Sequence, residues 1–216
     1  GFERAGLKTV LMCENDQQAR AVLQRHFNVP IRSDVRRMKS LPTCEVLTAG
    51  WPCQDLSQAG RMAGIDGHKS GLVEEVFRLL RASRRKPEFV VLENVPFAMH
   101  LQNGRALSRV TEHLASLGYL WAYRVLDTQW FGLPQRRRRL FILASRTNNP
   151  TNILFDERET TPSTIRNGQM TGFYWTEGNT GIGWSPGTVP PLKAGSGLSI
   201  PSPPAVWNRS NASFIL

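Results

Sequence analysis

Few cysteines are present, and the sequence lacks the usual signatures of a disulfide framework, a zinc site or a membrane span. Cys13, Cys44 and Cys53 are widely separated, with no Cys-x-x-Cys and no Cys/His spacing typical of zinc. No run approaches the roughly 18 apolar residues of a membrane span. The N-terminus lacks the basic-then-apolar pattern of a secretory signal. We therefore expect free thiols, a cytoplasmic location, no metal and no membrane association.

Acidic residues are outnumbered by basic ones, 17 to 27, which gives a formal net charge of +10. This excess favours a polyanionic partner, nucleic acid first, although a solvated basic surface is the alternative that charge alone leaves open. The 216 residues, 40% of them hydrophobic, suffice for one domain or for one domain and a small lobe. Because there is no initiator Met, we expect the sequence to start within a longer protein.

Apolar runs alternate with amphipathic segments over the first two thirds of the chain. We expect strands at 8–13, 46–49, 89–95, 121–126 and 140–144, and helices at 17–27, 72–81 and 107–117. This alternation predicts an α/β fold with a mostly parallel sheet. Gly, Pro, Ser, Thr and Asn then become frequent, with aromatics between them. We predict one domain over 1–147 and a small, irregular β-rich region over 148–216, the alternative for the latter being a disordered tail.

Polar groups lie at the ends of three of the expected strands. Cys53 comes after the strand 46–49, Glu93 and Asn94 lie at the end of 89–95, and the segment 135–139 precedes 140–144. A Cys and a carboxylate at neighbouring strand ends suit covalent catalysis. The alternatives are a buried structural thiol, a carboxylate that caps the helix starting near Pro96, and a solvated cluster of arginines. Strand alternation would send Arg137 and Arg139 to one face and Arg136 and Arg138 to the other.

These segments resemble the three signature blocks of the DNA cytosine-5 methyltransferase family. Pro-Cys-Gln occurs at 52–54, Glu-Asn-Val at 93–95 and Gln-Arg-Arg-Arg-Arg at 135–139, in the family's order. Each block is short and could arise by chance, but the three in this order are specific to the family. The resemblance implies a Rossmann-like sheet that uses S-adenosylmethionine, with a target-recognition region in the second part. It also implies double-stranded DNA as the partner and a bacterial or phage restriction-modification system with a cognate restriction endonuclease.

The resemblance assigns a role to each residue of the catalytic group. Cys53 would add to C6 of a flipped cytosine, and Glu93 would contact the base at N3 and the exocyclic amine. Arg139 would donate to the base O2, and Arg137 would brace the Cys53 loop and the DNA backbone. The Gly-rich stretch 57–71 matches the family's mobile loop that closes over the base.

Cofactor and DNA contacts are likewise implied by the resemblance. Glu14 would hold ribose hydroxyls and Asp34 the adenine amine, and the full cofactor set is Phe2, Glu14, Asp34, Gly50, Pro52 and Leu72. The predicted DNA contacts are Gln54, Ser57, Gln135, Arg137 and Leu192. A nicotinamide enzyme is less favoured, since no complete G-x-G-x-x-G is present.

Three departures from the family pattern weaken the expectation of activity. The chain begins inside the family's glycine-rich loop and ends before its closing Gly-Asn-Ser-Val block. It also carries Pro191 before Leu192, where the family has Thr. We therefore expect little or no activity from these residues alone. The alternative function is a catalytically inactive remnant that binds DNA in a salt-sensitive way. A tRNA-methylating relative ranks lower because its Cys-Phe-Thr tripeptide is absent.

Overall fold

The computed structural model describes residues 1–51, 72–156, 170–175, 182–189, 205–208, 210 and 212–215. The chain divides into two compact units. The first unit comprises Gly1–Arg124 with Leu140–Leu154, and the second comprises Val125–Arg139 with Phe155–Leu216. The functional division predicted between residues 147 and 148 stays a prediction.

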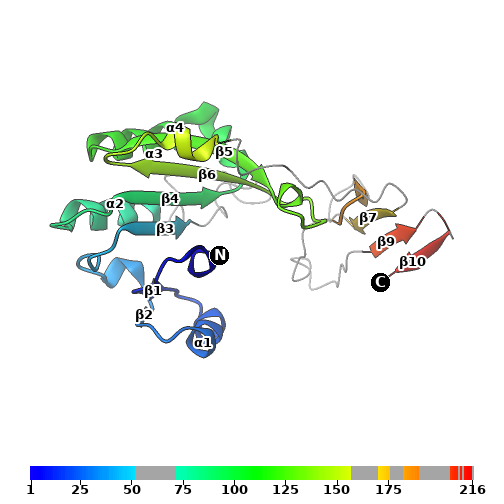
Figure 1. The fold of residues 1–216 in the computed structure, drawn as a ribbon, viewed down its shortest axis with the longest axis horizontal. Helices are drawn as coiled ribbons and strands as arrows, with labels where there is room; N and C mark the ends of the chain where they lie inside the picture. The colour runs from blue at the N-terminus through cyan, green and yellow to red at the C-terminus, as the bar shows by residue number, and fades with distance from the viewer. Residues whose placement is uncertain are drawn as a thin grey trace. The chain divides into compact units, whose positions relative to one another are not determined.

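A four-stranded sheet with the order β3-β4-β6-β5 provides the framework of the first unit (Figure 1). Its strands are β3 (Val46–Gly50), β4 (Phe89–Asn94), β5 (Leu120–Asp127) and β6 (Arg138–Ser145). β3 and β4 run parallel, with Gly50 opposite Glu93. β6 joins β4 in antiparallel orientation, with Phe141 opposite Glu93. The α/β class predicted from the sequence is confirmed, and β6 is an antiparallel addition to the parallel pair.

Two helices supply most of the buried side chains opposite this sheet, α2 (Leu72–Ala82) and α3 (Arg105–Ser116). In α2, Val73, Phe77 and Leu80 recur at helical spacing and are fully buried. Burial alternates along β4, as expected for a strand with one covered face. α3 ends before Gly118, which adopts a left-handed φ of 81° that favours glycine. The buried residues of the sheet and α3 include Val90, Leu92, Val110, Leu114, Leu140 and Ile142.

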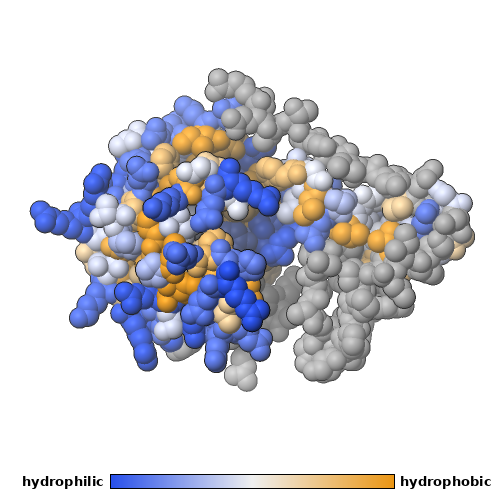
Figure 2. Space-filling view, turned by 60° about the horizontal axis from the view of Figure 1, so that its bottom comes forward, coloured by the Kyte–Doolittle hydropathy of each residue, from blue (hydrophilic) through white to orange (hydrophobic). Residues whose placement is uncertain are grey.

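Residues 12–32 form a smaller α/β arrangement within the first unit. The short parallel strands β1 (Met12–Cys13) and β2 (Ile31–Arg32) flank α1 (Gln17–His26). Asp16 is the N-cap of α1, and its Oδ1 accepts the Ala19 N–H at 2.7 Å. No residue in 1–51 is buried. Figure 2 turns this side of the molecule forward, and apolar side chains reach its surface between hydrophilic ones.

Short helices connect these elements in the described part of the chain. They are η1 (Glu3–Ala5), η2 (Val35–Arg37), η4 (Pro96–Met99), η5 (Leu101–Gly104), η6 (Thr128–Trp130) and α4 (Pro150–Leu154). None of the described helices is long and apolar enough to cross a membrane.

The second unit contains an antiparallel sheet in the order β10-β9-β7-β8. Its strands are β7 (Met170–Trp175), β8 (Ile182–Pro186), β9 (Ala205–Asn208) and β10 (Ser213–Ile215). Thr171, Phe173 and Ser185 are buried in it. This confirms the predicted β-rich character of the region and argues against a wholly disordered tail.

Candidate active site

Gly50 and Glu93 lie side by side at the carboxyl ends of two parallel strands. They are opposite each other in the β3–β4 register. A Cβ atom added to Gly50 would lie 3.1 Å from Glu93 Oε2, so the carboxylate passes close to the Gly50 backbone. A side chain at position 50 would press on this carboxylate, so glycine favours the close approach. The N-cap residue of η4 is Val95, which disfavours the alternative that Glu93 serves as that cap.

Asn94 ends β4 opposite Leu140 and is 2% exposed. Its Oδ1 accepts the Val95 N–H at 2.7 Å, which orients the amide. Its Nδ2 has no hydrogen-bond partner among the described residues. Buried amide donors are seldom left unpaired, so this strand end offers a polar group to whatever completes the site.

The arginine segment, residues 135–139, belongs to the second unit and is held by one buried carboxylate. Asp127 is 2% exposed, and its Oδ1 accepts the backbone N–H of Arg137 at 3.1 Å. Thr128 donates its N–H to the Arg137 carbonyl at 3.1 Å and its hydroxyl to the Gln135 carbonyl at 2.5 Å. The backbone of this segment is therefore fixed from both strand β5 and the turn that follows it.

Side chains along the arginine segment alternate in burial. Gln135, Arg137 and Arg139 are half-buried, whereas Arg136 and Arg138 are exposed. This is the two-residue alternation expected from the sequence. It disfavours the alternative of a uniformly solvated arginine cluster. Arg139 also donates from Nη1 to the Arg138 carbonyl at 2.8 Å.

Within the second unit, the arginine segment pairs with the backbone just after β8. Gln135 and Val189 form an isolated parallel bridge. Arg136 donates its N–H to the Val189 carbonyl at 2.9 Å, and Val189 donates its N–H to the Pro134 carbonyl at 2.8 Å. The predicted catalytic segment and the predicted recognition region thus share main-chain hydrogen bonds.

Two carboxylates that were predicted to contact the cofactor follow the paired strands β1 and β2. Glu14 comes directly after β1, and its N–H donates to the Arg32 carbonyl at 2.9 Å. Asp34 follows β2 and is the N-cap of η2. Burial raises the pKa of the thiol of Cys13, the last residue of β1, and the charges of Asp34 and Glu14 raise it further.

The Asp34 carboxylate is engaged by Arg36. It accepts the Arg36 N–H at 3.0 Å and the Arg36 guanidinium with both oxygens, with Nη2–Oδ2 at 2.9 Å. Hydrogen bonds from this side chain and then from its backbone N–H lower the pKa of Asp34. Asp34 therefore stays an acceptor over the physiological pH range.

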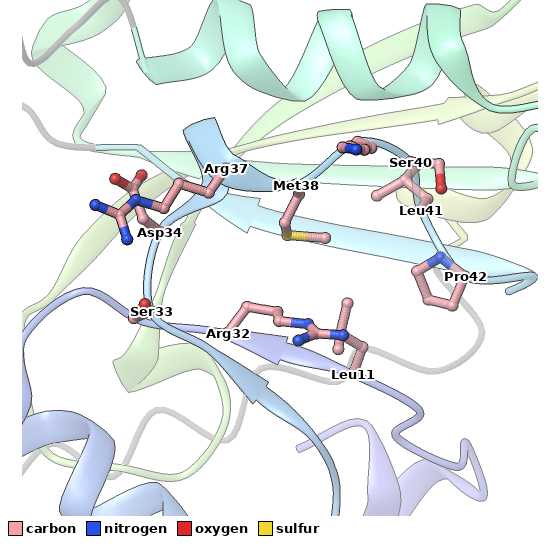
Figure 3. Close-up of a pocket in the computed structure, with 10 residues that line it drawn as sticks. Leu11, Arg32, Ser33, Asp34, Arg37, Met38, Ser40, Leu41 and Pro42 are labelled. Atoms are coloured by element: carbon pink, nitrogen blue, oxygen red, sulfur yellow. The ribbon is translucent and has the colours of Figure 1, made fainter.

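A cavity of about 590 Å³ opens beside Asp34 (Figure 3). Asp34 and Arg37 lie at one end and Leu41 and Pro42 at the other. The remaining lining residues are Leu11, Arg32, Ser33, Met38, Lys39 and Ser40. A cavity that combines apolar side chains on its walls with a carboxylate at its end can hold a nucleoside whose amine donates to that carboxylate.

The other predicted residues fall into two groups. Phe2 is 47% exposed at the start of η1, and Leu72 is the first residue of α2. Pro52, Cys53, Gln54, Ser57 and Leu192 lie outside the described residues, as does Pro191. Groups of three or more His, Cys, Asp or Glu side chains that could hold a metal ion do not occur within the described ranges.

Sequence analysis missed Asp127, Thr128 and Val189, which shape the arginine segment. Asp127 did carry a local signal, because an Asp that ends an apolar strand often caps the next turn. It is indeed the N-cap of η6, with Oδ1 accepting the Gln129 N–H at 3.3 Å. Val189 carried no signal, because its contacts are made by the backbone.

The family model for C-5 cytosine-specific DNA methylases matches residues 1–177. The chain belongs to this family. Among curated members, it is 44% identical to the type II methyltransferase M2.BsuMI of Bacillus subtilis (strain 168), with 96% of this chain and 56% of that protein aligned. It is 33% identical to the type II methyltransferase M.BsuFI of Bacillus subtilis, over 66% of this chain and 35% of that protein. The chain thus spans from about a third to just over half of the length of these relatives.

Solved structures of methyltransferases show the same fold at lower identity. The S. pombe Dnmt2 methyltransferase superposes with a TM-score of 0.59 at 18% identity, covering 76% of this chain and 54% of the other. The Entamoeba histolytica methyltransferase EhMeth gives a TM-score of 0.55 at 17% identity, covering 65% and 45%. These matches confirm the Rossmann-like methyltransferase sheet predicted for this C-5 methylase chain.

Proposed function

We propose that the protein is a DNA (cytosine-5-)-methyltransferase that transfers a methyl group from S-adenosylmethionine to C5 of a flipped cytosine in duplex DNA. The observation that carries this proposal is the pairing of Gly50 with Glu93 at the ends of adjacent parallel strands. Cys53 follows Gly50 by three residues in the chain. In the sequence, the proposed nucleophile therefore comes soon after the strand end that lies beside the Glu93 carboxylate, and open α/β sheets bind their ligands at such strand ends.

The chemistry assigns one task to each group. The Cys53 thiolate forms a bond to C6, and Glu93 holds the proton at N3, so the ring electrons move toward C5. S-adenosylmethionine, when bound, supplies an electrophilic methyl group for C5. Removal of the C5 proton then restores the C5–C6 double bond and expels the Cys53 thiolate. Arg139 holds the base O2, and Arg137 braces the Cys53 loop and the backbone.

For the cofactor, we propose that Glu14 accepts ribose hydroxyls and Asp34 accepts the adenine amine. Phe2, Gly50, Pro52 and Leu72 would line the rest of its site. The two carboxylates on adjacent parallel strands fit such a ligand, because a nucleoside offers hydroxyl and amine donors. No metal is required by this chemistry.

For DNA, we propose contacts from Gln54, Ser57, Gln135, Arg137 and Leu192. The net charge of +10 supports a polyanionic partner. The exposed guanidinium groups of Arg136 and Arg138 are free to approach phosphates. The type II relatives support a place in a bacterial restriction-modification system, with a cognate restriction endonuclease as a functional partner.

The decisive experiment traps the proposed adduct on duplex DNA that contains 5-fluorocytosine, in the presence of S-adenosylmethionine. Fluorine cannot leave as the C5 proton does, so the Cys53–C6 bond should persist and shift the protein on a denaturing gel. Cys53→Ser should abolish the complex, whereas Cys44→Ser, at a half-buried thiol elsewhere, should retain it. Salt-sensitive DNA binding without any adduct, even when the family's first-loop and closing segments are restored to the chain, would support the inactive remnant and contradict the enzyme.

Gly50→Ala should slow adduct formation about tenfold or more, because the new methyl group presses on the Glu93 carboxylate at 3.1 Å. Thr48→Ala, on the exposed side of the same strand, is the matched control and should stay within about twofold of wild type. Single-turnover trapping rates measure both. A Gly50→Ala rate equal to that of wild type would show that Glu93 does not depend on this close approach.

A further inference from the structure

The turn that carries Asp34 is held in place by a side chain from helix α2. Arg78 donates from Nη2 to the Met38 carbonyl at 2.8 Å and to the Val35 carbonyl at 3.2 Å. These two carbonyls belong to η2 and to the residue that ends it. The Arg78 Nε donates to Glu75 Oε2 at 2.6 Å, one turn earlier on the same helix. Glu75 therefore orients the guanidinium toward the turn.

A second hydrogen bond fastens the same segment to the end of α2. The Ser83 hydroxyl accepts the Leu41 N–H at 3.3 Å and donates to the Leu79 carbonyl at 2.8 Å. Ser83 is 5% exposed. The chain from Val35 to Leu41, one wall of the cavity beside Asp34, is thus tied to α2 near both of its ends.

The support is rigid, whereas the supported segment has little packing of its own. On its other face α2 buries Val73, Phe77 and Leu80 completely in the core. By contrast, no residue of 1–51 is buried. Val35, Met38 and Leu41 are only half-buried, so apolar packing holds the turn less firmly than the core, and polar contacts contribute more to where it sits.

The position of η2 also determines the position of the Asp34 carboxylate. Asp34 Oδ1 accepts the Arg36 N–H at 3.0 Å within η2, so the side chain is bound to the turn it caps. Moving η2 therefore moves the carboxylate with it.

We infer that Arg78 is a positioning residue for the adenosine end of the cofactor, acting through η2 on Asp34. This inference rests on the proposed function, which assigns Asp34 to the adenine amine. Arg78 does not reach the ligand: it fixes the wall of the cavity along which the nucleoside binds (Figure 3). Glu75 aligns Arg78, and Ser83 provides the second attachment.

The test compares Arg78→Ala with the control Arg81→Ala. Arg81 is an exposed arginine three residues further along the same helix, so its substitution removes the same charge. Equilibrium dialysis with labelled S-adenosylmethionine measures the dissociation constant. Hydrogen exchange measures the Arg37 and Met38 amides, which donate to the Asp34 and Val35 carbonyls within the turn. Arg78→Ala should weaken binding about tenfold and speed exchange at these two amides, and Arg78→Lys should restore part of both.

A purely structural role for Arg78 would lower the stability of the whole unit without a selective effect on this turn. Equal losses in Arg78→Ala and Arg81→Ala would overturn the inference. Unchanged exchange at Arg37 and Met38 in Arg78→Ala would overturn it as well, whatever the cofactor measurement shows. In a further outcome, the Arg78→Ala variant shows the expected faster exchange while the wild-type chain binds no S-adenosylmethionine. That pair of results would contradict the proposed cofactor site, while the Arg78 contact to the turn would stand.

Discussion

Asp127→Ala is expected to lower the free energy of unfolding by about 3 kcal/mol, because it removes a buried charged acceptor that serves several N–H groups. Asp127 Oδ1 accepts from Arg137 at 3.1 Å and from Gln129 at 3.3 Å, and Oδ2 accepts the Gln129 side-chain amide at 2.9 Å. Ala offers no oxygen, and the 2% exposure of Asp127 leaves little access for water. The turn carrying Arg137 should then lose its fixed position.

Asp127→Asn is the control for this prediction. It keeps one oxygen for the Arg137 N–H but removes the charge, and its amide faces the Gln129 amide unfavourably. We expect a smaller loss of about 1 kcal/mol, as for a weakened hydrogen bond. Urea denaturation followed by tryptophan fluorescence measures both variants, since Trp130 belongs to the adjoining turn. An Asp127→Ala value within about 0.5 kcal/mol of wild type, the range of ordinary surface substitutions, would contradict the proposed role.

Phe77→Ala is expected to lower the free energy of unfolding by about 3–5 kcal/mol, the usual cost of truncating a fully buried Phe. Phe77 is 0% exposed on α2, and its ring stacks on His113 of α3 with centroids 4.8 Å apart. The truncation removes contacts between the two helices that cover the sheet and leaves a cavity between them.

Val22→Ala provides the matched control for Phe77, because Val22 is 53% exposed on α1 and should cost less than about 0.5 kcal/mol. Phe77→Leu, which fills much of the space, should cost less than about 1.5 kcal/mol. Chemical denaturation monitored by circular dichroism measures the series. A Phe77→Ala cost no larger than that of Val22→Ala would show that the α2–α3 contact does not hold the core.

Helices were predicted well because their signals are local. The apolar spacing of α2 and the Asp16 cap of α1 depend only on nearby residues. Strand length is less local. The run 8–13 was expected to be a strand throughout, but β1 contains only Met12 and Cys13, because a strand extends only as far as its partner and β2 has two residues. The antiparallel orientation of β6 in the sheet likewise depends on the segment that connects it to β5, and not on the apolar run of β6 itself.

The candidate site shows the same limit. The alternating burial of Arg136–Arg139 followed from strand parity, and Glu93 followed from its place at a strand end. The 3.1 Å approach of Glu93 to Gly50 required the register between two strands separated by α2. Arg78 contacts a carbonyl 43 residues away, and no local pattern predicts such a pair.

The hydrogen bonds at Val189 have a consequence for how new specificities could arise. Both bonds between this residue and the Pro134–Arg136 segment use main-chain atoms, so they do not depend on the side chain at position 189. Any residue except proline, which lacks the N–H, could make them. If this region reads DNA as proposed, recognition sequences could therefore diverge, or be exchanged between relatives, without moving the arginines, provided that the spacing from β8 to this junction is kept. Under the proposed function, such an attachment would allow the target sequence to evolve separately from the chemistry.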